Sequence, residues 1–65
     1  MNAGEYVLVE FGSHNIQAAV ITETDREEQL VKVDNKRTVP HIVEWIPECK
    51  CKLVRKSTLQ ELGLL

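Results

Sequence analysis

The feature that most constrains this chain is a series of short segments in which apolar and polar residues alternate with a period of two. In the segment 6–11, Val7, Val9 and Phe11 fall on one side and the intervening residues on the other. β-branched and aromatic residues at this period predict a half-buried β-strand. Further strands are predicted over 16–22, 29–33, 38–46 and 49–56, so five short strands share 65 residues.

Turn-forming residues separate these segments. The stretch 12–15 contains Gly12 and Asn15, which tolerate positive φ, and 22–28 (TETDREE) is interpreted as an exposed loop. A polar turn is expected at 34–36. Pro40 interrupts the fourth segment, and because proline cannot donate to a strand ladder it marks an edge, a bulge or a corner.

The last residues predict a helix of one or two turns over 57–63. Ser57 or Thr58 is expected to act as N-cap, and Gly63 stands where a helix C-terminus favours positive φ. A helix this short is marginal alone, so Leu59 and Leu62 are expected to pin it to the rest of the domain.

Together these elements predict an all-β fold: a small five-stranded antiparallel barrel with a short C-terminal helical turn. A chain of 65 residues forms one domain, here 1–65, and closing the sheet removes its edges while keeping the core compact. The apolar share of 43% and the charged share of 28% are those of an ordinary globular chain. An open α+β sheet crossed by the helix is the alternative.

The segment 4–46 resembles the Tudor and related SH3-like small barrels. The matching residues are Gly4, Val7, Val9, Phe11, Ala18, Val20, Val33, Asp34, Val39 and Pro40. The resemblance implies a small barrel that binds another protein. Methyl-lysine-reading Tudor domains carry three or four aromatic residues in and after the first turn, where this chain has Ser13, His14, Asn15 and Ile16.

A second resemblance covers the stretches VEFGSHNIQAAVI and DNKRTVPHIV. They are similar to the first phosphate hairpin, and to the segment after it, of the actin, sugar-kinase and heat-shock-chaperone ATPases. That resemblance implies a fragment related to those ATPases, with Glu10, Gly12 and Ser13 at the phosphate loop. The family pattern has aspartate where this chain has Glu10, and the sequence contains no second phosphate loop or adenosine loop.

The two cysteines, Cys49 and Cys51, are one residue apart, which is too close for an unstrained disulfide in a strand. Both are interpreted as small core residues. With His14 and His41 they make four residues of zinc-binding type, but their spacing is not that of a zinc site. The sequence therefore predicts no metal, no cofactor and no enzymatic activity.

Acidic residues gather in the first half of the chain and basic residues in the second, around a net charge of −2. The function expected first is that of a non-enzymatic protein–protein interaction module, a small regulatory or adaptor protein. Tryptophan is enriched at binding hot spots, and acidic loops attract basic partners. The expected partner-binding residues are Trp45, Tyr6, Glu23, Asp25, Glu27 and Glu28.

The alternative is a nucleic-acid-binding barrel that uses basic residues of the second half of the chain. These residues are Lys36, Arg37, Lys50, Lys52, Arg55 and Lys56. A homo-oligomer is a further alternative, because a chain this small can leave an apolar strip exposed. With no signal peptide and no apolar run of membrane-spanning length, an intracellular location, cytoplasmic or nuclear, is expected, without membrane partners.

Overall fold

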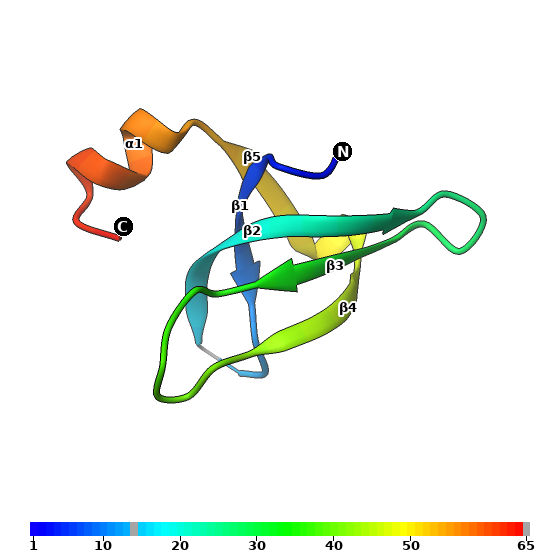
Figure 1. Ribbon diagram of the computed structural model, residues 1–65, viewed down its shortest axis with the longest axis horizontal. Coiled ribbons are helices and arrows are strands. Elements are labelled where there is room, and N and C mark those ends of the chain that lie inside the picture. The colour runs from blue at the N-terminus through cyan, green and yellow to red at the C-terminus, as the bar shows by residue number, and fades with distance from the viewer. Residues whose placement is uncertain (14, 65) are drawn as a thin grey trace.

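A computed structural model describes residues 1–13 and 15–64. Figure 1 shows one curved sheet followed by a short helix. The elements are β1 (Tyr6–Glu10), β2 (Ile16–Asp25), β3 (Leu30–Asp34), β4 (Val43–Pro47), the 3-10 helix η1 (Glu48–Lys50), β5 (Cys51–Val54) and α1 (Lys56–Glu61). All neighbouring strands are antiparallel, in the order β4-β3-β2-β1-β5. This confirms the predicted all-β class with five antiparallel strands and a C-terminal helical turn.

The long strand β2 joins two halves of the sheet. Its first part, Ile16 to Val20, pairs with β1, and Val20 to Asp25 pair with β3, with a shift in register between Ile21 and Glu23. Such an irregularity bends a strand and increases its twist. One half of the sheet is therefore β5-β1-β2 and the other is β2-β3-β4, with β4 and β5 as the outer strands of the order (Figure 1).

The core lies on the inner face of the curved sheet and is filled by small β-branched side chains. It contains Val7, Val9, Ala19, Ile21, Val31, Val33 and Ile46, with Met1, Phe11 and Cys51 packed against it. These residues stand at alternate positions of their strands, as a period of two requires. The alternation that predicted β1 and β3 is thus the pattern of residues that face the core.

Three predicted boundaries are wrong. The stretch 22–25 was expected to be loop but extends β2, because its residues pair with β3 while their polar side chains stay accessible. The fourth strand begins only at Val43, since Pro40 lies in the loop before it. The fifth begins at Cys51, so Cys49 lies in η1 and is exposed rather than buried, while Cys51 packs against the core.

Helix α1 is held by one leucine rather than two. Leu59 is completely buried, whereas Leu62 is 61% exposed. The helix begins at Lys56 after Arg55, without a side-chain cap, so the predicted capping by Ser57 or Thr58 is wrong. Gly63 has the expected positive φ of 73°. None of the helices in 1–13 and 15–64 is long and apolar enough to cross a membrane.

Candidate functional site

The outer face of the β2-β3-β4 half carries the single aromatic residue of these three strands, Trp45. In the register of the sheet Trp45 lies opposite Lys32, and Lys32 lies opposite Glu23. Lys32 Nζ is 3.2 Å from Glu23 Oε2. Trp45 is 45% exposed and Val43, two residues earlier on the same face of β4, is 43% exposed. We call these four residues, Val43, Trp45, Lys32 and Glu23, the Trp45 face.

The alternation of the strands explains why these side chains point outward. Val31 and Ile46 are directly paired and face the core, so their neighbours Lys32 and Trp45 must face the opposite side. Lys32 lies between Trp45 and Glu23, with its charge satisfied by the carboxylate. The Trp45 face is thus an apolar strip along β4 with an ion pair beside it.

The acidic residues predicted to bind a partner lie on the same half of the molecule but differ in role. Asp25 Oδ1 accepts hydrogen bonds from the backbone amides of Glu27 and Glu28, at 3.1 and 3.2 Å. Asp25 therefore organises the turn between β2 and β3. Glu27 and Glu28 are exposed in this turn. The fold thus brings Glu23, Asp25 and Trp45 onto one half of the sheet.

Tyr6 lies on the other half of the sheet, on β1, where its neighbours across the strands are Val20 and Val54. The Nζ atom of Lys56 is 6.0 Å from the centre of the Tyr6 ring, at the outer limit of a cation–π contact. Three strand intervals of about 4.8 Å separate β1 from β4 in the sheet. Tyr6 and Trp45 therefore do not form one aromatic patch.

The basic residues fall into two groups. Lys50, Lys52, Arg55 and Lys56 follow one another along η1, β5 and the start of α1, whereas Lys36 and Arg37 lie in the loop between β3 and β4. Lys50 also lines an open cavity of about 450 Å³ with Cys49, Glu10, Gly12 and Ser13. The residues of the phosphate-hairpin resemblance thus border the end of η1.

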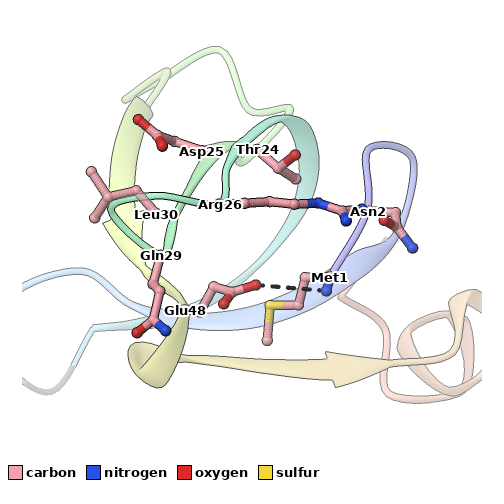
Figure 2. Close-up of a pocket in the computed structure, with 8 residues that line it drawn as sticks. All are labelled: Met1, Asn2, Thr24, Asp25, Arg26, Gln29, Leu30 and Glu48. Atoms are coloured by element: carbon pink, nitrogen blue, oxygen red, sulfur yellow. Dashed lines mark ion pairs between the residues drawn. The ribbon is translucent and has the colours of Figure 1, made fainter.

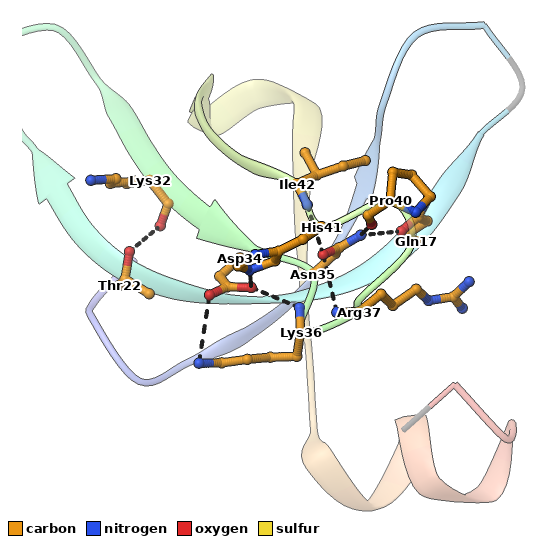
Figure 3. A network of polar contacts seen from close by, with 10 residues as sticks. All are labelled: Gln17, Thr22, Lys32, Asp34, Asn35, Lys36, Arg37, Pro40, His41 and Ile42. Atoms are coloured by element: carbon orange, nitrogen blue, oxygen red, sulfur yellow. Dashed lines mark hydrogen bonds and ion pairs between the residues drawn. The ribbon is translucent and has the colours of Figure 1, made fainter.

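A buried asparagine organises the loop between β3 and β4 (Figure 3). The Nδ2 atom of Asn35 donates to Gln17 Oε1 and to the Pro40 carbonyl, both at 3.0 Å. Its Oδ1 atom accepts from the amides of Arg37 and Ile42, at 3.2 and 3.0 Å. Throughout the described part of the chain, every buried side-chain nitrogen and oxygen has a partner. The loop 35–42 is consequently a defined structure.

Asp34 stabilises the same loop from the end of β3. Its Oδ1 atom accepts from the backbone amide of Lys36 at 2.7 Å and lies 3.0 Å from His41 Nε2, and Lys36 Nζ is 3.6 Å from Oδ2. The hydrogen bond from the Lys36 amide is the main cause that holds the pKa of Asp34 below its usual 3.8. Desolvation opposes it and is the next largest effect, while His41 and the Lys36 charge add smaller lowering contributions. Lys36 and Arg37 are both exposed, but the Lys36 ammonium is paired with Asp34 within the loop.

Sequence reasoning missed this network. Its one local signal is Gln17, a polar residue at an inner position of the otherwise apolar stretch 16–21. A buried amide needs a hydrogen-bond partner, but the partner, Asn35, is 18 residues away. Only the pairing of β2 with β3 brings the two side chains together.

A polar cavity of about 390 Å³ lies where the chain start meets the turn between β2 and β3 (Figure 2). The Met1 amine is 3.6 Å from Glu48 Oε1, and Arg26 extends across the cavity toward Asn2. Leu30 and the methionine side chain supply its apolar lining. The cavity is lined by both positively and negatively charged groups, so its charge favours neither an anion nor a cation.

Within the described part of the chain, Cys49, Cys51 and His41 do not belong to a metal-binding cluster. Among residues 1–13 and 15–64, no three side chains of metal-binding type come together. His14, considered from the sequence as a ligand, lies outside the described residues. Cys49 and Cys51 are both free thiols, and burial raises the pKa of Cys51, with smaller contributions from Cys49 and Glu48.

Comparison of this chain with protein-family models, with curated proteins and with solved structures found no match.

Proposed function

We propose that this chain is a non-enzymatic protein-interaction module of the Tudor and SH3-like kind, and that it binds its partner at the Trp45 face. The observation that carries the proposal is the exposure of Trp45 beside Val43 on an outer strand. A tryptophan offers a large contact area and is over-represented among the residues that dominate binding energy. The five antiparallel strands in a 65-residue domain support the relation to small barrels.

The charges around the Trp45 face favour a basic partner. Glu23 lies two strands away on the same face, and the exposed Glu27 and Glu28 stand at the end of the same hairpin. Lysine or arginine side chains of a partner would meet these carboxylates, and a cation can also stack on the indole ring. The expected ligand is a polypeptide segment that combines apolar and basic residues.

The test uses Trp45 as its own reporter, because it is the single tryptophan of the chain. The probe is a tryptophan-free peptide that alternates lysine with leucine or valine, and the comparison peptide carries glutamate in place of lysine. We expect the basic peptide to change the tryptophan emission and to shift the amide signals of β3 and β4. Equal responses to both peptides, or none, would contradict the proposal.

Two matched variants locate the binding site by amide chemical shifts. Trp45→Ala removes the central side chain of the Trp45 face, whereas Tyr6→Ala removes an aromatic side chain on the other half of the sheet. We expect Trp45→Ala to weaken peptide binding by roughly tenfold or more, in the range of a hot-spot residue. Tyr6→Ala is expected to leave it within about twofold.

A second function, nucleic-acid binding, is favoured by one specific observation. Lys52, Arg55 and Lys56 lie along β5 and its end beside Tyr6, and none of them makes an ion pair with another described residue. Basic side chains next to an aromatic ring are suited to phosphates and a stacked base. Titration with a short duplex and a short single strand separates the two functions, because phosphate contacts weaken steeply with salt.

A further inference from the structure

Strand β5 is the outer strand on the β1 side of the sheet (Figure 1), and the hydrogen bonds of β1 show which way its backbone groups point. The Phe11 amide donates to the Asn15 carbonyl at 2.8 Å, and the Ile21 amide donates to the Glu5 carbonyl at 2.9 Å. Bonded pairs alternate along antiparallel strands. The odd-numbered residues of β1 therefore bond to β2, and the even-numbered ones direct their amides and carbonyls toward β5.

The free edge of β5 is consequently formed by Cys51, Leu53 and Arg55. The residues between them, Lys52 and Val54, lie opposite even-numbered residues of β1 and bond to it. The Cys51 amide is used by η1 and the Arg55 carbonyl by α1. Four backbone groups remain, which are the Cys51 carbonyl, the Leu53 amide and carbonyl, and the Arg55 amide. Within 1–13 and 15–64, β1 is the sole strand partner of β5.

The side chains along this edge are two apolar residues between two cations. Leu53 is 48% exposed and Val54 is half-buried, and both line an open cavity of about 350 Å³. Lys52 and Arg55, on either side, are exposed, and neither makes an ion pair with another described residue. Glu5 also lines the cavity, but its carboxylate accepts a hydrogen bond from a backbone amide that precedes β1. The edge is thus apolar with uncompensated positive charge at both ends.

These features suit an extended polypeptide, and we propose that β5 binds an acidic and apolar segment of a partner protein as an added strand. In the antiparallel arrangement of the other strand pairs, the segment residue opposite Leu53 exchanges both hydrogen bonds with it. The residues two places away on either side pair with the Cys51 carbonyl and the Arg55 amide. All four backbone groups of the edge then have a partner.

The side chains of β5 specify the sequence of the added strand. Directly opposed residues lie on the same face of a sheet, and opposite charges or apolar side chains at such positions stabilise the pairing. Acidic residues therefore belong opposite Lys52 and Arg55, and apolar residues belong opposite Leu53 and Val54. The resulting pattern is acidic–apolar–apolar–acidic, and it is the same for either direction of the added strand.

The backbone groups distinguish this partner from a nucleic acid, which would use the same cations. A phosphate accepts hydrogen bonds but offers no donor to the Leu53 carbonyl, whereas the amide of an added strand does. The inference also goes beyond the proposed function, because it concerns the other outer strand and an acidic partner. Peptide-induced shifts in β5 test the one, and shifts in β3 and β4 test the other.

The experiment is an amide NMR titration of the labelled full chain with the blocked peptide Thr-Glu-Val-Val-Glu-Thr. We expect shifts in β5 and β1, with a Kd of about 0.1–1 mM, and binding at least roughly fivefold weaker when lysine replaces both glutamates. The absence of shifts in β5, or equal binding of the two peptides, would overturn the proposal. So would shifts caused by a short single-stranded nucleic acid but not by the acidic peptide.

Two N-methylated peptides test the backbone pairing. For either direction of the added strand, the amide of the second valine donates to the Leu53 carbonyl and that of the first valine points away. Methylation of the second valine should weaken binding roughly tenfold or more, and methylation of the first should leave it within about threefold. Equal effects of the two methyl groups would mean that side chains alone hold the peptide, which contradicts an added strand.

Two matched variants test the charge pairing. Arg55→Glu sets a negative charge opposite a glutamate of the peptide and should raise Kd roughly three- to tenfold. Arg26→Glu makes the same change at an exposed residue of the turn between β2 and β3 and should leave Kd within about twofold. Equal effects of the two variants would mean that net charge alone attracts the peptide, and would contradict the assigned register.

Discussion

Replacing Asn35 by alanine should destabilise the whole domain, because this side chain holds the loop 35–42 against β2. The substitution removes four hydrogen bonds, two donated by Nδ2 and two accepted by Oδ1, and it leaves the buried Gln17 carbonyl oxygen without its donor. At about 1 kcal/mol for each bond, the expected loss is about 3–4 kcal/mol, the lower value applying if the Arg37 amide reaches water. A chain of 65 residues has a free energy of unfolding of only about 3–10 kcal/mol. Asn35→Ala should therefore lose roughly a third or more of the stability of the domain.

The assay is urea unfolding at neutral pH, followed both by far-ultraviolet circular dichroism and by the emission of Trp45. Asn15→Ala is the matched control, because the exposed Asn15 accepts one hydrogen bond, from Gln17 Nε2 at 3.1 Å. The control should cost about 1 kcal/mol or less. A loss below about 1 kcal/mol in Asn35→Ala, or one equal to that of the control, would refute the reasoning that this network organises the loop.

Three other predictions concern single groups. The carboxyl of Asp34 should titrate below 3.8 by NMR, and because its folded pKa is lowered, the stability that it contributes should be present above pH 3.8 and lost as the pH falls through that folded pKa. Leu59→Ala should lower the free energy of unfolding by about 2–5 kcal/mol in urea titrations, because the side chain is fully buried, while Leu62→Ala should change it by less than about 0.5 kcal/mol. A thiol reagent at neutral pH should modify the exposed Cys49 faster than Cys51, whose pKa is raised by burial, as mass spectrometry of single-cysteine variants would show.

Each of these predictions has a result that would contradict it. A midpoint at or above 3.8 would mean that the amide and cation around Asp34 do not stabilise its charged form. Equal effects of the two leucine substitutions would mean that α1 is not held by Leu59. Faster modification of Cys51 than of Cys49 would mean that the start of β5 opens more readily than its packing against the core implies.

The strands could be located from the sequence because the core is made by alternation within each strand. The predicted segment 6–11 corresponds to β1 at Tyr6–Glu10, and 29–33 corresponds to β3 at Leu30–Asp34. Boundaries failed where pairing rather than hydrophobicity decides the structure. The polar end of β2 is a strand because β3 lies beside it, and this neighbour is invisible in the local sequence.

The inner face of β2 could not be chosen from the sequence for a related reason. Both sides of the stretch 16–21 are largely apolar, and the side that faces the core contains the polar Gln17 with Ala19 and Ile21. Period two alone favours the other side, which has no polar residue. Gln17 is tolerated inside because Asn35 satisfies its carbonyl oxygen. A polar residue at an inner position was therefore a sign of a distant partner.

The same network fixes the position of the candidate binding face. Trp45 faces outward only because β4 pairs with β3 in the register that sets Trp45 opposite Lys32 and Ile46 opposite Val31. A shift of β4 by one residue would turn Trp45 toward the core and Ile46 toward solvent. The loop 35–42 connects the two strands and sets this register, and Asn35 holds the loop at both of its ends. Folded molecules of Asn35→Ala should therefore also bind the basic peptide more weakly, although Asn35 is far from the peptide in this proposal. Unchanged peptide affinity in the folded fraction would show that the register of β4 is set by the core residues alone.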